Sequence, residues 1–293
     1  MVNHTRARSY LYVPGDREDM LGRALQRGAD ALILDLEDAV AEAARADAVR
    51  VTSAFVHAGA GCRVELWVRV HPAHLRDQLE AVVSPHLTGI VLPKATAELA
   101  ADVDEVLRQA ERAAGMPERQ LAVLGLVETA QALRQIDRLA VAARVVRLGI
   151  GEADLRADLG VEPSSDAIEL LFARSTVVAA SAAAAIQPPV APSTTDFRDL
   201  EAVRSSTRQL VRLGFRARTA IHPAQVSIIN EELTPSPDQV RWAREITRTF
   251  QEAAVAQRGA VVDHEGRMLD VAVVRTAEDI LRRAGEPSED GFR

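Results

Sequence analysis

Short apolar runs alternate with amphipathic segments along most of the chain. Several of the runs are apolar at nearly every position, as in strands buried on both faces of a parallel sheet. Each run is followed within two residues by a charged residue, a proline or a glycine, which bounds the strand. The pattern predicts strands at residues 10–13, 31–36, 64–70, 89–92, 121–127, 145–150, 186–190 and 219–221.

The segments between these runs have the spacing of helices, and several end at a glycine. They predict helices at residues 18–28, 41–59, 75–83, 96–115, 168–185 and 199–214. Strict alternation of strands and helices over roughly 230 residues is typical of a (β/α)8 TIM barrel, an α/β fold. A doubly wound sheet is the alternative, but its G-x-G-x-x-G loop is incomplete, because Asp154 stands where the third glycine would follow Gly149 and Gly151.

The pattern changes after residue 233, where Pro235 and Pro237 interrupt the alternation. Two further helices are predicted at residues 238–259 and 271–285, with a hairpin-like turn at 264–266 between them. We therefore expect a catalytic barrel at 1–233 and a C-terminal helical extension at 234–293. The extension is too small to form a core of its own, so we expect it to pack on the barrel or on a neighbouring subunit.

Composition narrows the class of protein. The net charge of −7 argues against binding to nucleic acids or anionic membranes, which requires a basic face. The single cysteine, Cys62, allows no internal disulfide and fits a reducing compartment. The N-terminus is not typical of a signal peptide, and no apolar tract is long enough to span a membrane. We expect a cytoplasmic protein.

The stretch from Leu121 to Leu155 contains the strongest chemical signal. One apolar run ends in Glu128, and the next ends in Glu152 and Asp154. The carboxyl ends of parallel barrel strands meet on one face, so these acids are expected to lie close together. Oxygen ligands without cysteines or a His-x-x-x-His pair favour Mg2+, or Mn2+, over structural zinc.

Each of these residues also has a purely structural interpretation. Glu128 would then interact with a helix dipole, and Asp154 would be a helix N-cap. Arg69, at the end of the strand at 64–70, is either an ion-pair partner for one of the acids or a clamp for a ligand carboxylate. Lys94 could form a Schiff base, but among so many acids we expect it to stay protonated.

Other polar residues near strand ends are assigned structural roles. We expect Asp38 to be the N-cap of the helix that follows it. His71 and His74 are expected to be structural or exposed, and His222 to be structural rather than part of a binding pocket.

Seven motifs in sequence order, with an eighth near the C-terminus, resemble those of citrate lyase beta-subunit-like proteins. That group belongs to the HpcH/HpaI aldolase superfamily and is related to the malyl-CoA and citramalyl-CoA lyases. The motifs are RSYLYVPGD at 8–16, LDLEDAV at 34–40, VRVH at 68–71, LPKA at 92–95, VETA at 127–130, GEADL at 151–155, AIHPAQV at 220–226 and GRMLD at 266–270.

The resemblance implies a (β/α)8 barrel that binds Mg2+ and usually forms a trimer. It implies that Glu128 and Asp154 hold the metal, with Glu128 thereby also contacting the substrate. Arg69 would clamp the carboxylate of a 2-oxo acid such as oxaloacetate, glyoxylate or pyruvate. Asp270 would be an acid/base residue that a neighbouring subunit contributes. Arg8 would contact the substrate or a phosphate of CoA.

The chain departs from the family pattern at three places. His71 stands where the family usually has Asn, Ala217-Arg218 replaces Gly-Lys, and Gln187 replaces a frequent Asp. These changes leave the implied metal ligands intact. We expect His71 to affect the pocket near the oxo acid, and Ala217-Arg218 to affect contacts with CoA or between subunits.

The implied activity is a Mg2+-dependent carbon–carbon lyase, or the reverse condensation. Its substrate would be a 3-hydroxyacyl-CoA such as citryl-, malyl- or citramalyl-CoA, and its products a 2-oxo acid and an acyl-CoA enolate. Three alternatives remain: a citrate lyase beta subunit acting on a carrier-protein thioester, a metal-dependent aldolase acting on free hydroxy-oxo acids, and a barrel that only binds a metabolite or a partner protein.

Overall fold

The computed structural model describes residues 7–59, 64–255, 262 and 267–286. The chain divides into two compact units, Met1–Leu233 and Thr234–Arg293. None of the helices in the described residues is both long enough and apolar enough to cross a membrane.

The first unit is a closed barrel whose eight parallel strands follow one another in chain order. Sequence neighbours pair along the whole ring, and β1 pairs with β8 to close it. The predicted (β/α)8 fold is therefore confirmed. The strands are β1 (Ser9–Pro14), β2 (Ala31–Asp35), β3 (Glu65–Arg69), β4 (Gly89–Leu92), β5 (Ala122–Val127), β6 (Val145–Ile150), β7 (Gln187–Ala191) and β8 (Ala217–Ala220).

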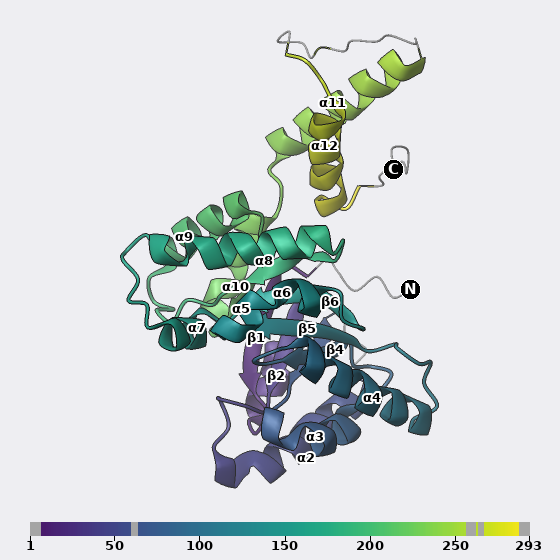
Figure 1. Ribbon diagram of the computed structural model, residues 1–293, viewed down its shortest axis with the longest axis vertical. Helices are drawn as coiled ribbons and strands as arrows, with labels where there is room; N and C mark the ends of the chain where they lie inside the picture. The colour runs from purple at the N-terminus through teal and green to yellow at the C-terminus, as the bar shows by residue number, and fades with distance from the viewer. Residues whose placement is uncertain (1–6, 60–63, 256–261, 263–266, 287–293) are drawn as a thin grey trace. The chain divides into compact units, whose positions relative to one another are not determined.

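Helices connect the strands and surround the barrel (Figure 1). The helices of the first unit are α1 (Glu18–Ala24), α2 (Arg45–His57), α3 (Leu75–Val82), α4 (Ala97–Ala113), α5 (Ala130–Arg134), α6 (Ile136–Ala140), α7 (Glu152–Leu159), α8 (Leu171–Ala183), α9 (Leu200–Leu213) and α10 (Pro223–Leu233). The described part of this unit also contains three short 3-10 helices: η1 (Glu42–Ala44), η2 (Pro72–His74) and η3 (Ile168–Leu170).

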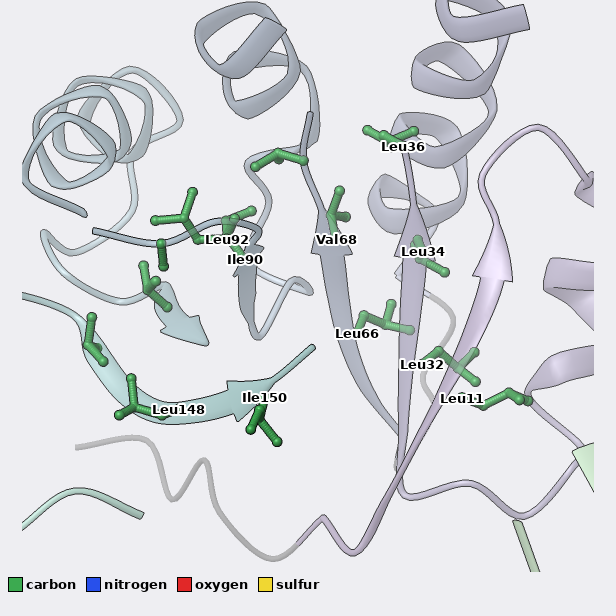
Figure 2. Close-up of a cluster of buried hydrophobic side chains, with 14 of the residues drawn as sticks. Leu11, Leu32, Leu34, Leu36, Leu66, Val68, Ile90, Leu92, Leu148 and Ile150 are labelled. Carbon is green, nitrogen blue, oxygen red and sulfur yellow. The ribbon is translucent and has the colours of Figure 1, made fainter. Parts of the chain in front are cut away.

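Two apolar layers explain why the strands are apolar at successive positions. Along β2, Leu32 and Leu34 belong to the layer between the strands and the helices, part of which is shown in Figure 2. Ala31 and Ile33 alternate with them and belong to a second cluster that also contains Trp67. Because consecutive side chains point to opposite faces of a strand, both faces of β2 are buried, as its sequence predicts.

Some predicted boundaries differ from the structure. The helix predicted at 18–28 ends earlier, at Ala24, and β8 begins at Ala217, two residues before the predicted start at 219. The beginning of β8 was missed because Arg218 interrupts the apolar pattern, although the structure buries this side chain. Helix α10, directly after β8, was not predicted.

The second unit contains α11 (Pro237–Val255) and α12 (Val271–Arg283). These helices share a small apolar cluster that includes Ala243, Ile246 and Ala277. The predicted hairpin turn at 264–266 lies outside the described residues, while Val262 and Met268 on either side of it form an antiparallel bridge. Packing of this extension on the barrel or on a neighbouring subunit stays a prediction.

Candidate active site

A cavity of about 600 Å3 lies at the carboxyl ends of the barrel strands. It brings together three residues that the sequence analysis selected: Arg69, Glu128 and Asp154. Its other polar lining residues are Tyr12, Asp35, Asp38, Glu152, Arg156, Ser193, Thr194, Thr195 and Thr219. The cavity therefore contains carboxylates and arginines from several strands, as expected at the active face of a barrel.

Glu128, directly after β5, is only 4% exposed. Its Oε2 accepts a hydrogen bond of 3.0 Å from the backbone N–H of Lys94. Lys94 has a φ of 48°, in the left-handed region that non-glycine residues rarely adopt. On the other side, a Cβ added to Gly151 would lie 2.5 Å from Oε1 of Glu128. The backbone segments after β4 and β6 thus lie directly against this carboxylate and fix its position.

The pKa of Glu128 is raised to about 7, mainly by burial and also by the negative charges of Glu37 and Asp154, while the hydrogen bond from the Lys94 N–H acts in the opposite direction. The energetic cost of holding a buried carboxylate next to other acids decreases when a cation binds. The described residues contain no cluster of three or more His, Cys, Asp or Glu side chains placed to hold a metal. Two carboxylates are nevertheless enough for Mg2+, which usually keeps several waters or substrate oxygens as ligands. Glu128 and Asp154 therefore fit this ion.

Asp154 lies in the first turn of α7 and is exposed to the cavity. The N-cap of α7 is Gly151, so the interpretation of Asp154 as an N-cap is wrong. The neighbouring acid, Glu152, forms a paired contact with Arg174 of α8, with N–O distances of 2.6 and 2.9 Å. Arg174 compensates the charge of Glu152, which distinguishes the two acids that follow β6.

Arg69, at the end of β3, is held by three carboxylates. Its Nε and Nη2 donate to the two oxygens of Asp35 at 2.7 and 2.6 Å. Its Nη1 lies 2.9 Å from Glu37 and 3.0 Å from Asp38. The guanidinium also lies 4.9 Å from the centre of the Tyr12 ring. Arg69 is thus an ion-pair partner and part of the cavity wall at once, so both interpretations of it stay compatible with the structure.

Asp38 is not the N-cap of the following helix, because its carboxylate binds Arg69 and Ala41 occupies the N-cap of η1. Glu37, which the sequence analysis included only as part of the motif at 34–40, is buried, and burial raises its pKa to about 7. The signal that could have identified it is its place in an acidic triplet directly after a buried strand. Around Arg69, acidic side chains outnumber basic ones, and this excess of negative charge favours a bound cation.

The remaining polar residues near strand ends have mainly structural contacts. Lys94 is half exposed, with its Nζ 3.7 Å from Glu37, and is not among the cavity-lining residues. His71 accepts a hydrogen bond from the backbone of Ala73, as an N-cap does. His222 stacks on Phe197, with ring centres 4.5 Å apart.

Two other predicted site residues do not belong to the carboxyl ends of the barrel strands. Arg8 precedes β1, so it is at the opposite end of the barrel from the cavity, where it forms an ion pair of 2.8 Å with Asp30. The structure therefore does not bring Arg8 together with Arg69 and Glu128. Asp270 belongs to the second unit, where it is the N-cap of α12 and accepts a hydrogen bond of 2.9 Å from the N–H of Val273. Its acid/base role stays a prediction.

Comparisons with known proteins agree on one family. The family model for HpcH/HpaI aldolase/citrate lyase matches residues 8–223. The L-malyl-CoA/beta-methylmalyl-CoA lyase of Rhodobacter capsulatus is 31% identical, with 94% of each chain covered. The mitochondrial citramalyl-CoA lyase of Rattus norvegicus is 27% identical, over 94% of this chain and 86% of that protein. A crystal structure of CitE from Mycobacterium tuberculosis with magnesium, acetoacetate and coenzyme A is 30% identical, with a TM-score of 0.76, over 97% of this chain and 100% of that chain.

Proposed function

Because the chain belongs to the HpcH/HpaI aldolase/citrate lyase family, we propose that it is a Mg2+-dependent carbon–carbon lyase. The substrate is a 3-hydroxyacyl-CoA such as citryl-, malyl- or citramalyl-CoA, and the enzyme cleaves it or forms it in the reverse condensation. The observation that carries this proposal is the joint presence of Glu128, Asp154 and Arg69 in one cavity. The lyase names of the relatives and the magnesium and coenzyme A in the CitE crystal structure support it.

In this proposal Glu128 and Asp154 hold Mg2+. When bound, the ion neutralises the negative charge that develops on the oxygen of the 2-oxo acid. Below a pH of about 7 Glu128 carries a proton that has to leave before the carboxylate can serve as a ligand. The Lys94 N–H and the absence of a side chain at Gly151 keep this carboxylate in one position.

Arg69 binds the carboxylate of the oxo acid. Its two hydrogen bonds to the buried Asp35 fix the plane of the guanidinium. The Asp38 side chain is 66% exposed, so it is the partner of Arg69 that a substrate carboxylate can displace at the lowest cost. Fixing the carboxylate in this way orients the rest of the substrate in the cavity before the reaction starts.

In the cleavage direction the hydroxyl at C3 of the acyl chain transfers its proton to a solvent water, and the bond between C2 and C3 breaks. C3 becomes the carbonyl carbon of the oxo acid, and the electron pair remains on the thioester as an enolate. The carboxyl group of Asp270 then delivers a proton to C2, and in the condensation direction its carboxylate removes that proton. We place Asp270 at the site of a neighbouring subunit in a homotrimer, and the reaction in the cytoplasm.

Turnover of a small substrate panel with and without EDTA tests the proposal. The panel consists of malyl-CoA, citramalyl-CoA and citryl-CoA for cleavage, and of acetyl-CoA with glyoxylate for condensation. EDTA-sensitive turnover of one of them supports a stand-alone lyase and identifies its substrate. Inactivity on the panel, with Mg2+-dependent binding of oxaloacetate retained, would instead favour a citrate lyase beta subunit that acts on a carrier-protein thioester. Cleavage of free hydroxy-oxo acids alone would favour an aldolase.

A further inference from the structure

Arg218, in the middle of β8, is a buried cation whose hydrogen-bond partners are all uncharged. The residue is 2% exposed, and in the described part of the chain its guanidinium forms no ion pair with a carboxylate. It donates to the carbonyls of Pro192 (3.0 Å) and Val203 (3.0 Å) and to the hydroxyls of Thr194 (2.5 Å), Ser206 (2.9 Å) and Thr207 (2.5 Å). A buried charge without an opposite charge is unfavourable, so a ligand that supplies a negative charge would be bound more tightly here.

The nearby acid does not supply that charge in full. Glu152 attracts Arg218, but its carboxylate already forms two hydrogen bonds with Arg174. Two guanidinium groups therefore share one carboxylate. Burial lowers the pKa of Arg218 to about 10, which still leaves it protonated at neutral pH. Arg156 of α7 also lines the cavity and adds a further positive charge to its wall.

Thr194 connects Arg218 to the cavity. Its hydroxyl oxygen accepts from Nη2 of Arg218, and its backbone carbonyl accepts from Nε2 of Gln225 at 2.9 Å. A hydroxyl that accepts a hydrogen bond from a cation keeps its own proton for donation to another group. Ser193 and Thr195 flank Thr194, and all three residues line the cavity. This wall thus contains three hydroxyl-bearing residues, and the hydroxyl of one of them, Thr194, is polarised by a buried cation.

We propose that residues 193–195, with Arg218 behind them, form a subsite for an anionic oxygen group of the ligand. Thr194 donates to a carboxylate or phosphate oxygen, and Arg218 is the positioning residue that holds and polarises Thr194. This inference rests on the proposed function, because it concerns a second part of the same substrate.

The location of the subsite in the ring defines what it recognises. The loop follows β7, and in a closed ring of eight strands β7 lies opposite β3, which carries Arg69. A ligand with two anionic groups can therefore bind to Arg69 at one end and to Thr194 at the other. The distal carboxylate of a dicarboxylic 2-oxo acid such as oxaloacetate meets this requirement, and so does a phosphate of CoA.

The test measures binding to the full-length protein in Mg2+ by calorimetry, with fresh oxaloacetate, pyruvate and free CoA as three probes. The variant Thr194→Val removes the hydroxyl and nearly keeps the shape of the side chain. Ser206→Ala is the matched control, because it also removes an acceptor of Arg218 but from a residue outside the cavity lining. We expect Thr194→Val to weaken oxaloacetate binding about tenfold, with pyruvate unaffected and Ser206→Ala without effect on any probe.

Thr194→Ser, which keeps a hydroxyl, is expected to restore oxaloacetate binding. A selective loss of CoA binding would also support the subsite and would assign it to a phosphate. Equal losses for all three probes, or no loss for any, would overturn the inference while leaving the proposed function standing. A wild-type protein that binds none of the probes would overturn both.

Discussion

Asp154 and Glu128 contribute to the proposed metal site from different environments. Glu128 is buried, and neighbouring backbone segments fix its position, whereas Asp154 is exposed in the first turn of α7. A substitution at Asp154 therefore disturbs less packing than one at Glu128. This difference makes Asp154 the better position for separating the chemistry of the site from the stability of the fold.

Asp154→Asn is expected to lower Mg2+-dependent turnover by at least about a hundredfold, because an amide oxygen carries no negative charge for the metal. The free energy of unfolding should stay close to that of the wild type. Turnover on the panel substrate and urea unfolding measure the two effects. Asp166→Asn, at an exposed residue that does not line the cavity, is the matched control. Full activity of Asp154→Asn would exclude the residue as a ligand.

At the scale of elements, the turns after the strands determine the geometry of the site. Gly151 stands between β6 and α7, where any side chain would collide with Glu128. Lys94 follows β4 closely and turns its N–H toward the same carboxylate through a left-handed backbone conformation. The two turns hold Glu128 from opposite sides without using a charged side chain.

Gly151→Ala is expected to weaken Mg2+ binding by about tenfold or more, because its Cβ would lie 2.5 Å from both Cγ and Oε1 of Glu128 and would displace the carboxylate. Titration of Mg2+ by calorimetry measures the loss. Gly22→Ala is the control, since a Cβ at Gly22 would meet no atom of the described residues within 4 Å beyond its chain neighbours and the backbone of α1. Equal Mg2+ affinity in wild type and Gly151→Ala would show that Glu128 does not hold the ion in this position.

The strands and the acids at their ends could be predicted from the sequence, whereas contacts between distant elements could not. The strands could be predicted because both faces of each are buried, and Glu128 and Asp154 could be selected because they end apolar runs. The pairing of Glu152 with Arg174 could not be predicted, since it joins α7 to α8 across 22 positions. The burial of Arg218 could not be predicted either, because a charged residue within an apolar run normally indicates an exposed position.

At the scale of the whole molecule, stability should depend on pH through a residue remote from the cavity. Glu65 lies at the start of β3, on the opposite end of the barrel from the cavity, and burial raises its pKa from 4.5 to about 7. Its Oε2 accepts a hydrogen bond of 3.0 Å from Nε1 of Trp67. The folded state holds the proton of Glu65 more tightly than the unfolded state. Its contribution to stability therefore falls as the pH rises from about 4.5 to about 7.

Glu65→Gln is expected to be more stable than the wild type at pH 8, by on the order of 1 kcal/mol, and equally stable near pH 4.5. Glutamine keeps an acceptor for Trp67 and carries no charge to bury. Urea unfolding at several pH values measures the difference. A stability difference that does not change with pH would show that Glu65 titrates alike in both states.

The proposed role of Asp270 is a property of the assembly. Asp270→Ala is expected to leave Mg2+-dependent oxo-acid binding near normal and to lower turnover by about a hundredfold or more. If a neighbouring subunit supplies this residue, mixing Asp270→Ala with Asp154→Asn subunits restores part of the activity, because some sites then combine an intact barrel with an intact Asp270. Activity that does not recover after subunits have exchanged would place Asp270 in its own subunit's site, and full activity of Asp270→Ala would refute its acid/base role.

The contact between Lys94 and Glu128 has a consequence for the evolution of the sequence. The main chain of Lys94 makes the contact, so selection acts on a backbone conformation rather than on a particular side chain at this position. Asparagine or glycine at position 94 would adopt that conformation readily and would keep the contact. Variation at such a position can therefore conceal an unchanged interaction, and a search for fixed residue identities would overlook it.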